Sequence, residues 1–164
     1  MKMIFDEFQG KTAIITGAAS GMGLLCAQRL AENGANVFMA DADEEAVRRK
    51  AQAIAEQGGS AMPAVVDVRF YNQVEQVAKK AAEQFGHIDI LVNCAGGSAA
   101  RIKQVDGFFP RMDPEVIDWG LDVNLKGPLH FARAVLPYML EQKSGVMINV
   151  GSTCGNAGSG SVEY

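Results

Sequence analysis

Cysteine is scarce in this chain, and no two cysteines have the spacing of a metal or redox pair. The three residues Cys26, Cys94 and Cys154 are odd in number, and none belongs to a C-x-x-C motif. A disulfide framework or a zinc site is therefore not expected, and we predict no metal site. The sequence favours a reducing compartment, the cytoplasm, and we expect all three thiols to be buried structural groups.

The chain also lacks a long apolar segment and an excess of positive charge. No apolar run is long enough to span a bilayer, and the acidic start, residues 1–6, lacks the apolar stretch of a signal peptide. The net charge of -4 argues against electrostatic binding to nucleic acid or to an anionic membrane. A single anionic small ligand remains compatible with this charge, because backbone dipoles can hold a phosphate.

What the chain does contain is a regular alternation of apolar strands and amphipathic helices. Its 164 residues, 48% hydrophobic and 21% charged, suffice for one domain with a substantial core. The periodicities predict strands at Thr12–Thr16, Val37–Ala40, Ala64–Val66, Ile88–Val92 and Val146–Val150, and helices at Gly21–Asn33, Asp43–Gln57, Tyr71–Phe85 and Pro114–Gln142.

Continuous apolar strands alternating with helices predict a parallel sheet that is covered on both faces. Right-handed crossovers then give an α/β fold, a Rossmann-type doubly wound sheet, as one domain over residues 1–164. A polar loop is expected from Ser98 to about Pro114, and Pro128 and Pro137 should bend or interrupt the last helix.

A glycine-rich turn, Thr16–Gly23, joins the first predicted strand to the first helix. Gly17 permits a sharp exit from the strand, Gly21 lets backbone N–H groups approach a pyrophosphate, and Gly23 lets the helix pack closely. The helix N-terminus adds partial positive charge. Since a strand and a helix flank the turn, this context favours a dinucleotide-binding unit over a simple tight turn, and the P-loop pattern is absent.

Asp41 closes the second predicted strand, about 20 residues beyond the turn, where a carboxylate can accept hydrogen bonds from the adenosine ribose hydroxyls. It would repel a 2′-phosphate, and no arginine or lysine lies in the turn or just after Asp41. The sequence therefore predicts NAD as the cofactor and disfavours NADP. The alternative interpretation is an ordinary aspartate at a helix entry, a position that Asp43 also suits.

Five motifs, in order along the chain, resemble those of the short-chain dehydrogenase/reductase family. They are Thr16-Gly17-x-x-x-Gly21-x-Gly23, Asp67-Val68, Asn93-Cys94-Ala95-Gly96 (where the family has asparagine at position 94), Val123-Asn124-Leu125-Lys126-Gly127, and Ile148–Ser152 followed by Tyr164. The resemblance implies a cofactor site built from Gly17, Ser20, Gly21, Met22, Gly23, Asp41, Asp67, Val68, Asn93, Ala95 and Gly96.

The resemblance also implies the reaction, a hydride transfer between a small secondary alcohol or ketone and C4 of nicotinamide. Tyr164 would be the general acid/base, Ser152 would polarise the substrate oxygen, and Asn124 would support a water in a proton relay. Members of the family commonly form homodimers and homotetramers through the long helix, which implies the same here.

Two features depart from the family pattern. Ser152 and Tyr164 are 12 positions apart, one fewer than in the family, and the family's lysine four positions after the tyrosine has no counterpart. Lowering a phenol pKa from ~10 to ~7 requires roughly 4 kcal/mol, which that lysine would largely supply. We therefore expect a fragment of a longer enzyme, without the later strands and helices, that has little or no activity as it stands.

Two other functions remain open from the sequence. The chain could be a module that binds NAD without catalysis, or a purely structural α/β interaction domain that binds neither dinucleotide. In each case Val146–Val150 is expected to be an apolar sheet edge that needs a cover.

Overall fold

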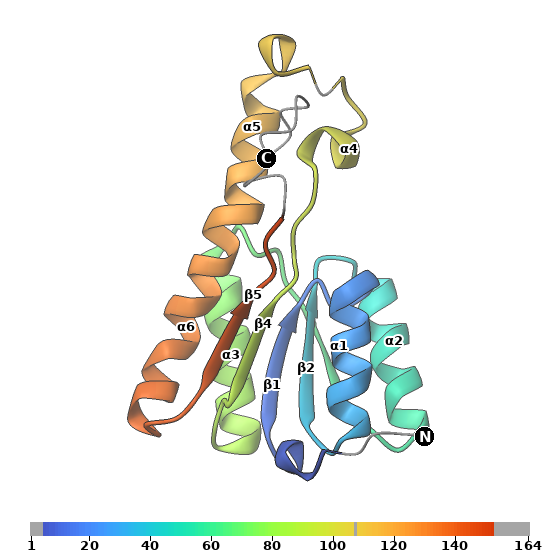
Figure 1. The fold of residues 1–164 in the computed structure, drawn as a ribbon, viewed down its shortest axis with the longest axis vertical. Helices are drawn as coiled ribbons and strands as arrows, with labels where there is room; N and C mark the ends of the chain where they lie inside the picture. Colours follow the sequence, from blue (N-terminus) through green and yellow to red (C-terminus); the bar gives the residue numbers. More distant parts are fainter. Residues whose placement is uncertain (1–4, 107, 153–164) are drawn as a thin grey trace.

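The computed structural model describes residues 5–106 and 108–152 (Figure 1). Its sheet has five parallel strands in the order β3-β2-β1-β4-β5. The strands are β1 Thr12–Thr16, β2 Asn36–Asp41, β3 Ser60–Val65, β4 Ile90–Asn93 and β5 Val146–Asn149. The predicted doubly wound α/β fold is confirmed.

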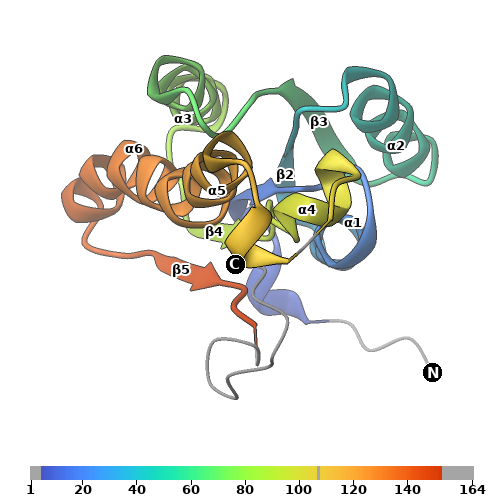
Figure 2. The same ribbon diagram turned by 90° about the horizontal axis from the view of Figure 1, so that it is seen from above.

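Helices cover both faces of the sheet and enclose two separate cores (Figure 2). The main helices are α1 Gly21–Glu32, α2 Glu44–Glu56, α3 Tyr71–Phe85 and α6 Gly127–Glu141. The core under α3 and α6 includes Ile14, Leu91 and Phe131, and the core under α1 and α2 includes Ile15 and Met39. Neighbouring residues of β1 therefore serve opposite faces, as the pleat requires.

The third strand begins earlier than the sequence analysis predicted. β3 spans Ser60–Val65, whereas Ala64–Val66 was expected. The strand lies at the edge of the sheet and pairs only with β2 in the described part of the chain. An edge strand tolerates Pro63 and a half-exposed pattern, so its sequence does not resemble a buried strand.

The long helical segment after Asp113 is continuous but changes its winding. Asp113 caps α5 Pro114–Leu121 through its carboxylate, which accepts from the N–H of Glu115 at 2.9 Å. A π-helical turn, Asp122–Lys126, then leads into α6. In a regular helix the ring of Pro128 would clash with the carbonyl of residue 124, and a wider turn relieves that clash.

Pro137 was predicted to bend or interrupt the last helix; it lies inside α6, which continues through it to Glu141. One expectation for this half of the chain needs correction. The segment expected to be a polar loop contains the short helix α4 Ala99–Lys103 and a 3₁₀ turn, Phe109–Arg111. It also exposes large apolar side chains, among them Ile102, Val105, Phe108 and Phe109.

The cysteines are less buried than predicted. Cys26 and Cys94 are half-buried and pack against the core under α1 and α2, while Cys154 lies outside the described residues. Neither of the first two is fully enclosed, because both sit at the margin of that core.

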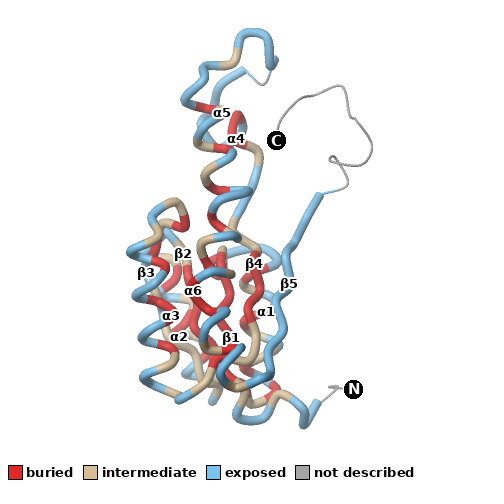
Figure 3. Tube along the Cα trace, turned by 90° about the vertical axis from the view of Figure 1, so that its left-hand side faces the viewer, coloured by how far each residue is buried: buried red, intermediate tan, exposed pale blue. Residues whose placement is uncertain are grey.

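Within residues 5–106 and 108–152, the strand β5 forms the second edge of the sheet, and it is exposed along its length (Figure 3). It pairs with β4, and Val146, Ile148 and Val150 line an apolar groove beside α1. The expected apolar edge is therefore present. Over residues 5–106 and 108–152, no helix has the length and apolar character to cross a bilayer.

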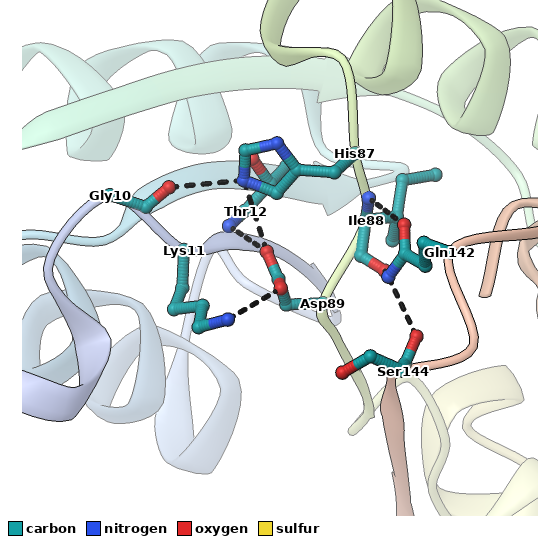
Figure 4. A network of polar contacts seen from close by, with 8 residues as sticks. All are labelled: Gly10, Lys11, Thr12, His87, Ile88, Asp89, Gln142 and Ser144. Atoms are coloured by element: carbon teal, nitrogen blue, oxygen red, sulfur yellow. Dashed lines mark hydrogen bonds and ion pairs between the residues drawn. The ribbon is translucent and has the colours of Figure 1, made fainter.

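The amino ends of β1 and β4 are joined by a polar network (Figure 4). Asp89 accepts from Lys11 Nζ and from the backbone N–H of Thr12, both at 2.9 Å. Gln142, at the end of α6, bonds both to the backbone N–H and to the carbonyl of Ile88. These contacts fix the end of the sheet that lies away from the glycine turn.

Candidate functional site

A cavity of about 580 Å³ lies at the carboxyl edge of the sheet, around the ends of β1, β2 and β4. Parallel α/β sheets bind ligands at this edge, where the strand order changes direction between β1 and β4. The lining residues are Gly17, Ser20–Gly23, Asp41–Asp43, Val66–Arg69, Cys94–Gly96, Ile102, Trp119 and Val123. The structure thus brings together all of the predicted cofactor residues except Asn93.

At two positions the glycine turn lies so close to other backbone atoms that there is no room for a side chain. A Cβ on Gly17 would lie 2.9 Å from the Ala95 backbone, and the φ of Gly17 is +64°. A Cβ on Gly23 would lie 2.2 Å from the carbonyl oxygen of Gly17. These short distances explain why glycine is required at both positions, which were predicted from spacing alone.

Thr16 anchors the turn to the loop after β4. Its buried Oγ1 accepts from the backbone N–H groups of Cys94 at 3.1 Å and Ala95 at 2.9 Å. Thr16 belongs to the glycine-turn motif, although no role was predicted for it. A hydroxyl at the last position of a buried strand was the available signal, since a buried polar group needs a partner.

The N-terminus of α1 faces an open part of the site. Ser20 precedes the helix in an extended conformation, and its side chain makes no capping bond within the described part of the chain. A Cβ on Gly21 would meet nothing within 4 Å, and Met22 is 62% exposed. The first N–H groups of a helix have no intrahelical acceptor, so this arrangement can receive an anion.

Asp41 lies at the end of β2, and two backbone groups fix its carboxylate. Its Oδ2 accepts from the N–H of Ala19 at 2.9 Å, and its Oδ1 from the N–H of Asp43 at 3.0 Å. Each carboxylate oxygen can accept two hydrogen bonds, so both oxygens keep capacity for hydroxyl donors. Asp43 itself caps α2 by accepting from Ala46 at 2.9 Å, which assigns the helix-entry role to Asp43 rather than to Asp41.

A cation that the sequence analysis missed also lines the cavity. The guanidinium of Arg69 bonds to both carboxylate oxygens of Asp67, with Nε at 2.9 and 3.0 Å. The hydrogen bond from Arg69 holds the pKa of Asp67 below its ordinary value. Arg69 follows the predicted Asp67-Val68 pair directly, so adjacency to that pair was the signal that could have identified it.

Asn93 lies behind the cavity rather than on its surface. It is 3% exposed, and its Nδ2 donates to Oδ1 of Asn149 across β4 and β5 at 2.8 Å. Its own Oδ1 has no partner among the described residues. In this structure Asn93 joins two strands, whereas its neighbours Cys94, Ala95 and Gly96 line the cavity.

The predicted catalytic residues have different positions in the structure. Asn124 sits in the π-turn, where its Oδ1 accepts from the N–H of Gly97 at 2.9 Å and its Nδ2 donates to the Gly97 carbonyl at 3.0 Å. Ser152 is exposed, just beyond β5. Tyr164 lies outside the described residues.

Cys94, where the family has asparagine, lines the cavity and also packs against the core under α1 and α2. Burial, with a smaller contribution from nearby Cys26, raises the pKa of Cys94 to about 11. The thiol is therefore protonated and unreactive at neutral pH, and it contributes packing rather than a nucleophile.

Comparison with known proteins agrees with the motifs and the fold. The family model for short chain dehydrogenase matches residues 11–164. An uncharacterized oxidoreductase of Staphylococcus saprophyticus is 37% identical over 150 residues, which cover 91% of this chain and 62% of the relative. The 3-oxoacyl-[acyl-carrier-protein] reductase of Thermotoga maritima is 34% identical over 153 residues, covering 93% of this chain and 60% of the relative.

Solved structures agree as well. The crystal structure of gox2181 superposes with a TM-score of 0.84 at 32% identity, covering 94% of this chain and 59% of that one. A Burkholderia xenovorans structure gives 0.85 at 30% identity, covering 95% and 62%. The chain spans about three fifths of the length of these relatives. On the family model, the five motifs and the superposed fold, the chain belongs to the short-chain dehydrogenase family.

Proposed function

We propose that this chain contributes to an NAD-dependent oxidoreductase that transfers a hydride between a secondary alcohol or ketone and nicotinamide. The observation that carries the cofactor assignment is Asp41. Its carboxylate is held in the cavity by the N–H groups of Ala19 and Asp43, where it can accept hydrogen bonds from two ribose hydroxyls. A phosphate on the ribose would meet a like charge.

The cavity has the features that a dinucleotide requires. The turn Gly17–Gly23 and the first N–H groups of α1 would bind the pyrophosphate, and Asp41 would orient the adenosine ribose. When bound, the nicotinamide supplies or accepts the hydride at its C4. The ketone substrate is supported by the Thermotoga maritima relative, whose name specifies a 3-oxoacyl group.

The three remaining predicted residues would bind the substrate oxygen and transfer its proton. Ser152 would donate a hydrogen bond to the substrate oxygen, and Tyr164 would deliver or remove its proton. Asn124 would support a water on the proton path, at the point where its side chain already joins the π-turn to Gly97.

A second candidate, NADP, is favoured by one observation, which is that Arg69 lines the same cavity as Asp41. A guanidinium can pair with a 2′-phosphate. However, Arg69 already donates to both oxygens of Asp67, and this pairing offsets its charge. We therefore favour NAD.

Calorimetric titration of the chain with NAD and NADP tests the assignment. We expect NAD to bind at least about tenfold more tightly than NADP, because one unfavourable charge contact costs on the order of 1.4 kcal/mol or more. Tighter binding of NADP would transfer the assignment to the second candidate. Binding of neither dinucleotide would favour a purely structural domain.

We also propose that the chain forms a homodimer or homotetramer through its long helical segment. Five leucines, each at least 39% exposed, recur along α5, the π-turn and α6 at helical spacing: Leu121, Leu125, Leu129, Leu136 and Leu140. An apolar stripe of this kind suits a second copy of the same helix. Sedimentation should show an oligomer that Leu129→Glu with Leu136→Glu converts to monomer, whereas Lys80→Glu on α3 has no effect. A wild-type monomer at micromolar concentration would contradict the proposal.

A further inference from the structure

A group of exposed apolar side chains lies beyond the carboxyl edge of the sheet, on the segment between β4 and α5. We call residues 99–106 and 108–112 the apolar lobe; it contains α4 and the turn Phe109–Arg111 and projects past the strand ends beside α5 (Figure 1). Its two buried residues are alanines. Its four large apolar side chains are each close to half exposed: Ile102, Val105, Phe108 and Phe109. Exposed apolar side chains that are grouped in this way mark a binding surface.

The charged side chains that adjoin this surface are cations without a carboxylate partner. Arg101, Lys103 and Arg111 form no ion pair within residues 5–106 and 108–152. The carboxylates nearest to them in the sequence, Asp106 and Asp113, accept instead from backbone N–H groups.

One of these cations lies directly on an apolar side chain of the lobe. The central carbon of the Arg111 guanidinium is 5.0 Å from the centre of the Phe108 ring. A cation that stacks on a ring keeps its N–H groups for an anion. The lobe is therefore complementary to a ligand that is apolar and carries a negative group.

The apolar lobe is continuous with the cofactor cavity at two points. Ile102 lines the cavity, and its Cδ1 would lie 2.9 Å from a Cβ on Gly97, the residue that bonds to Asn124. Lys103 Nζ lies 5.5 Å from the centre of the Trp119 ring, and Trp119 also lines the cavity. A molecule whose reacting group lies near Asn124 would therefore extend toward the lobe.

Resting on the proposed hydride-transfer function, we propose that the apolar lobe binds the body of the substrate, and that this body is an apolar chain that bears an anionic group. Phe108 and Phe109 pack against the chain, and Arg101 and Arg111 pair with the anion. The surface of an anionic membrane has the same chemistry. A soluble substrate is favoured because the lobe opens onto the cofactor cavity, which a membrane-binding surface does not require.

The fluorescence of Trp119, the single tryptophan, reports binding beside the lobe. The whole chain is titrated with octanoate, and with octan-1-ol and butyrate, which lack the charge or most of the chain. Octanoate should bind saturably and at least about tenfold more tightly than either, since each of the other two loses one kind of contact.

Two double variants separate the apolar contact from the charged one. Phe108→Ser with Phe109→Ser should weaken octanoate binding at least about tenfold. Arg101→Gln with Arg111→Gln should lower the affinity for octanoate to within about threefold of that for octan-1-ol, and should leave octan-1-ol binding unchanged. All of these side chains are exposed, so the circular dichroism of both variants should match that of wild type.

The matched controls are Leu25→Ser, at an exposed position of α1, and Arg133→Gln, since Arg133 also lies over a ring, that of Tyr71, at 5.4 Å. Neither should change octanoate binding. Absence of octanoate binding, or an equal loss from a control variant, would overturn the inference. So would phosphatidylglycerol vesicles that bind wild type when octanoate does not, because the lobe would then be a membrane-binding surface.

Calorimetric titration of the same proteins with NAD distinguishes this inference from the proposed function. The lobe variants should bind NAD as wild type does. NAD binding without octanoate binding would overturn the inference alone. Octanoate binding without NAD binding would overturn the proposed function instead.

Discussion

Two aspartates at opposite ends of the sheet have different surroundings. Asp89, beside the start of β4, is 11% exposed and meets Lys11, the N–H of Thr12 and His87, whose Nε2 lies 3.2 Å from Oδ2 (Figure 4). Asp41, at the end of β2, meets two backbone N–H groups and otherwise borders the cavity. A carboxylate that pairs with a side-chain cation, as Asp89 does, links secondary-structure elements to one another. A carboxylate that is held only by backbone N–H groups, as Asp41 is, keeps its negative charge available to a ligand.

The neighbours of the two aspartates differ as well. Around Asp89, Gln142 bonds to Ile88 and to the Ser144 carbonyl, so β4, α6 and the chain leading to β5 are joined. Around Asp41, the turn glycines exclude side chains and leave a space of about 580 Å³. We therefore propose that the amino edge serves stability and the carboxyl edge serves binding, and substitutions should separate the two.

The largest effect is expected from Asp89→Ala. It removes the acceptor of the Thr12 N–H, which is buried, as well as the partner of Lys11. The free energy of unfolding should fall by about 3 kcal/mol, as measured by urea denaturation. Glu75→Ala, at an exposed position of α3, should cost less than about 0.5 kcal/mol, and a similar loss from both variants would show that the network contributes nothing specific.

A smaller effect is expected at the other edge, from Asp41→Ala. NAD affinity should fall on the order of 30-fold, because hydrogen bonds to a charged acceptor are lost, with little change in the affinity for NADP. Asp113→Ala supplies the control, since it removes the cap of α5 away from the residues that line the cavity and should cost about 1 kcal/mol of stability. Equal losses of NAD affinity in the two variants would refute the assignment of Asp41.

The smallest effect is expected from Gln142→Ala. The Gln142 side chain makes three hydrogen bonds to backbone groups, two to Ile88 and one to Ser144. In the variant these bonds would be lost, and water would replace the amide as the partner. The stability should fall by about 1 kcal/mol, with unchanged NAD affinity. A change in that affinity would indicate that the two edges are coupled.

Most of the fold could be predicted because buried strands and helices carry strong periodicity. α3 begins at Tyr71 and ends at Phe85 as expected, with the left-handed Gly86 after it. The exceptions are elements that periodicity does not describe. β3 is a half-exposed edge strand that contains Pro63, and the wide turn Asp122–Lys126 depends on how Pro128 meets the preceding carbonyl.

The site was predictable where spacing along one segment determines it, and less so where distant segments meet. Gly17, Gly23 and Asp41 follow from a strand, a turn and a helix in sequence. The roles of Arg69 and Thr16 depend on contacts with another strand end or on an ion pair. Asn93 was predicted as a cofactor residue from its motif, but the direction of its side chain toward Asn149 is set by the pairing of β4 with β5.

Amide hydrogen exchange with and without NAD tests the division between the two edges most directly. On addition of NAD, exchange should slow in the turn Gly17–Gly23, at Asp41–Asp43 and at Cys94–Gly96, and should stay unchanged at residues 87–89 and 142–144. No change in exchange at the carboxyl edge, or an equal change at both edges, would contradict the proposed division of the sheet into a stabilising edge and a binding edge.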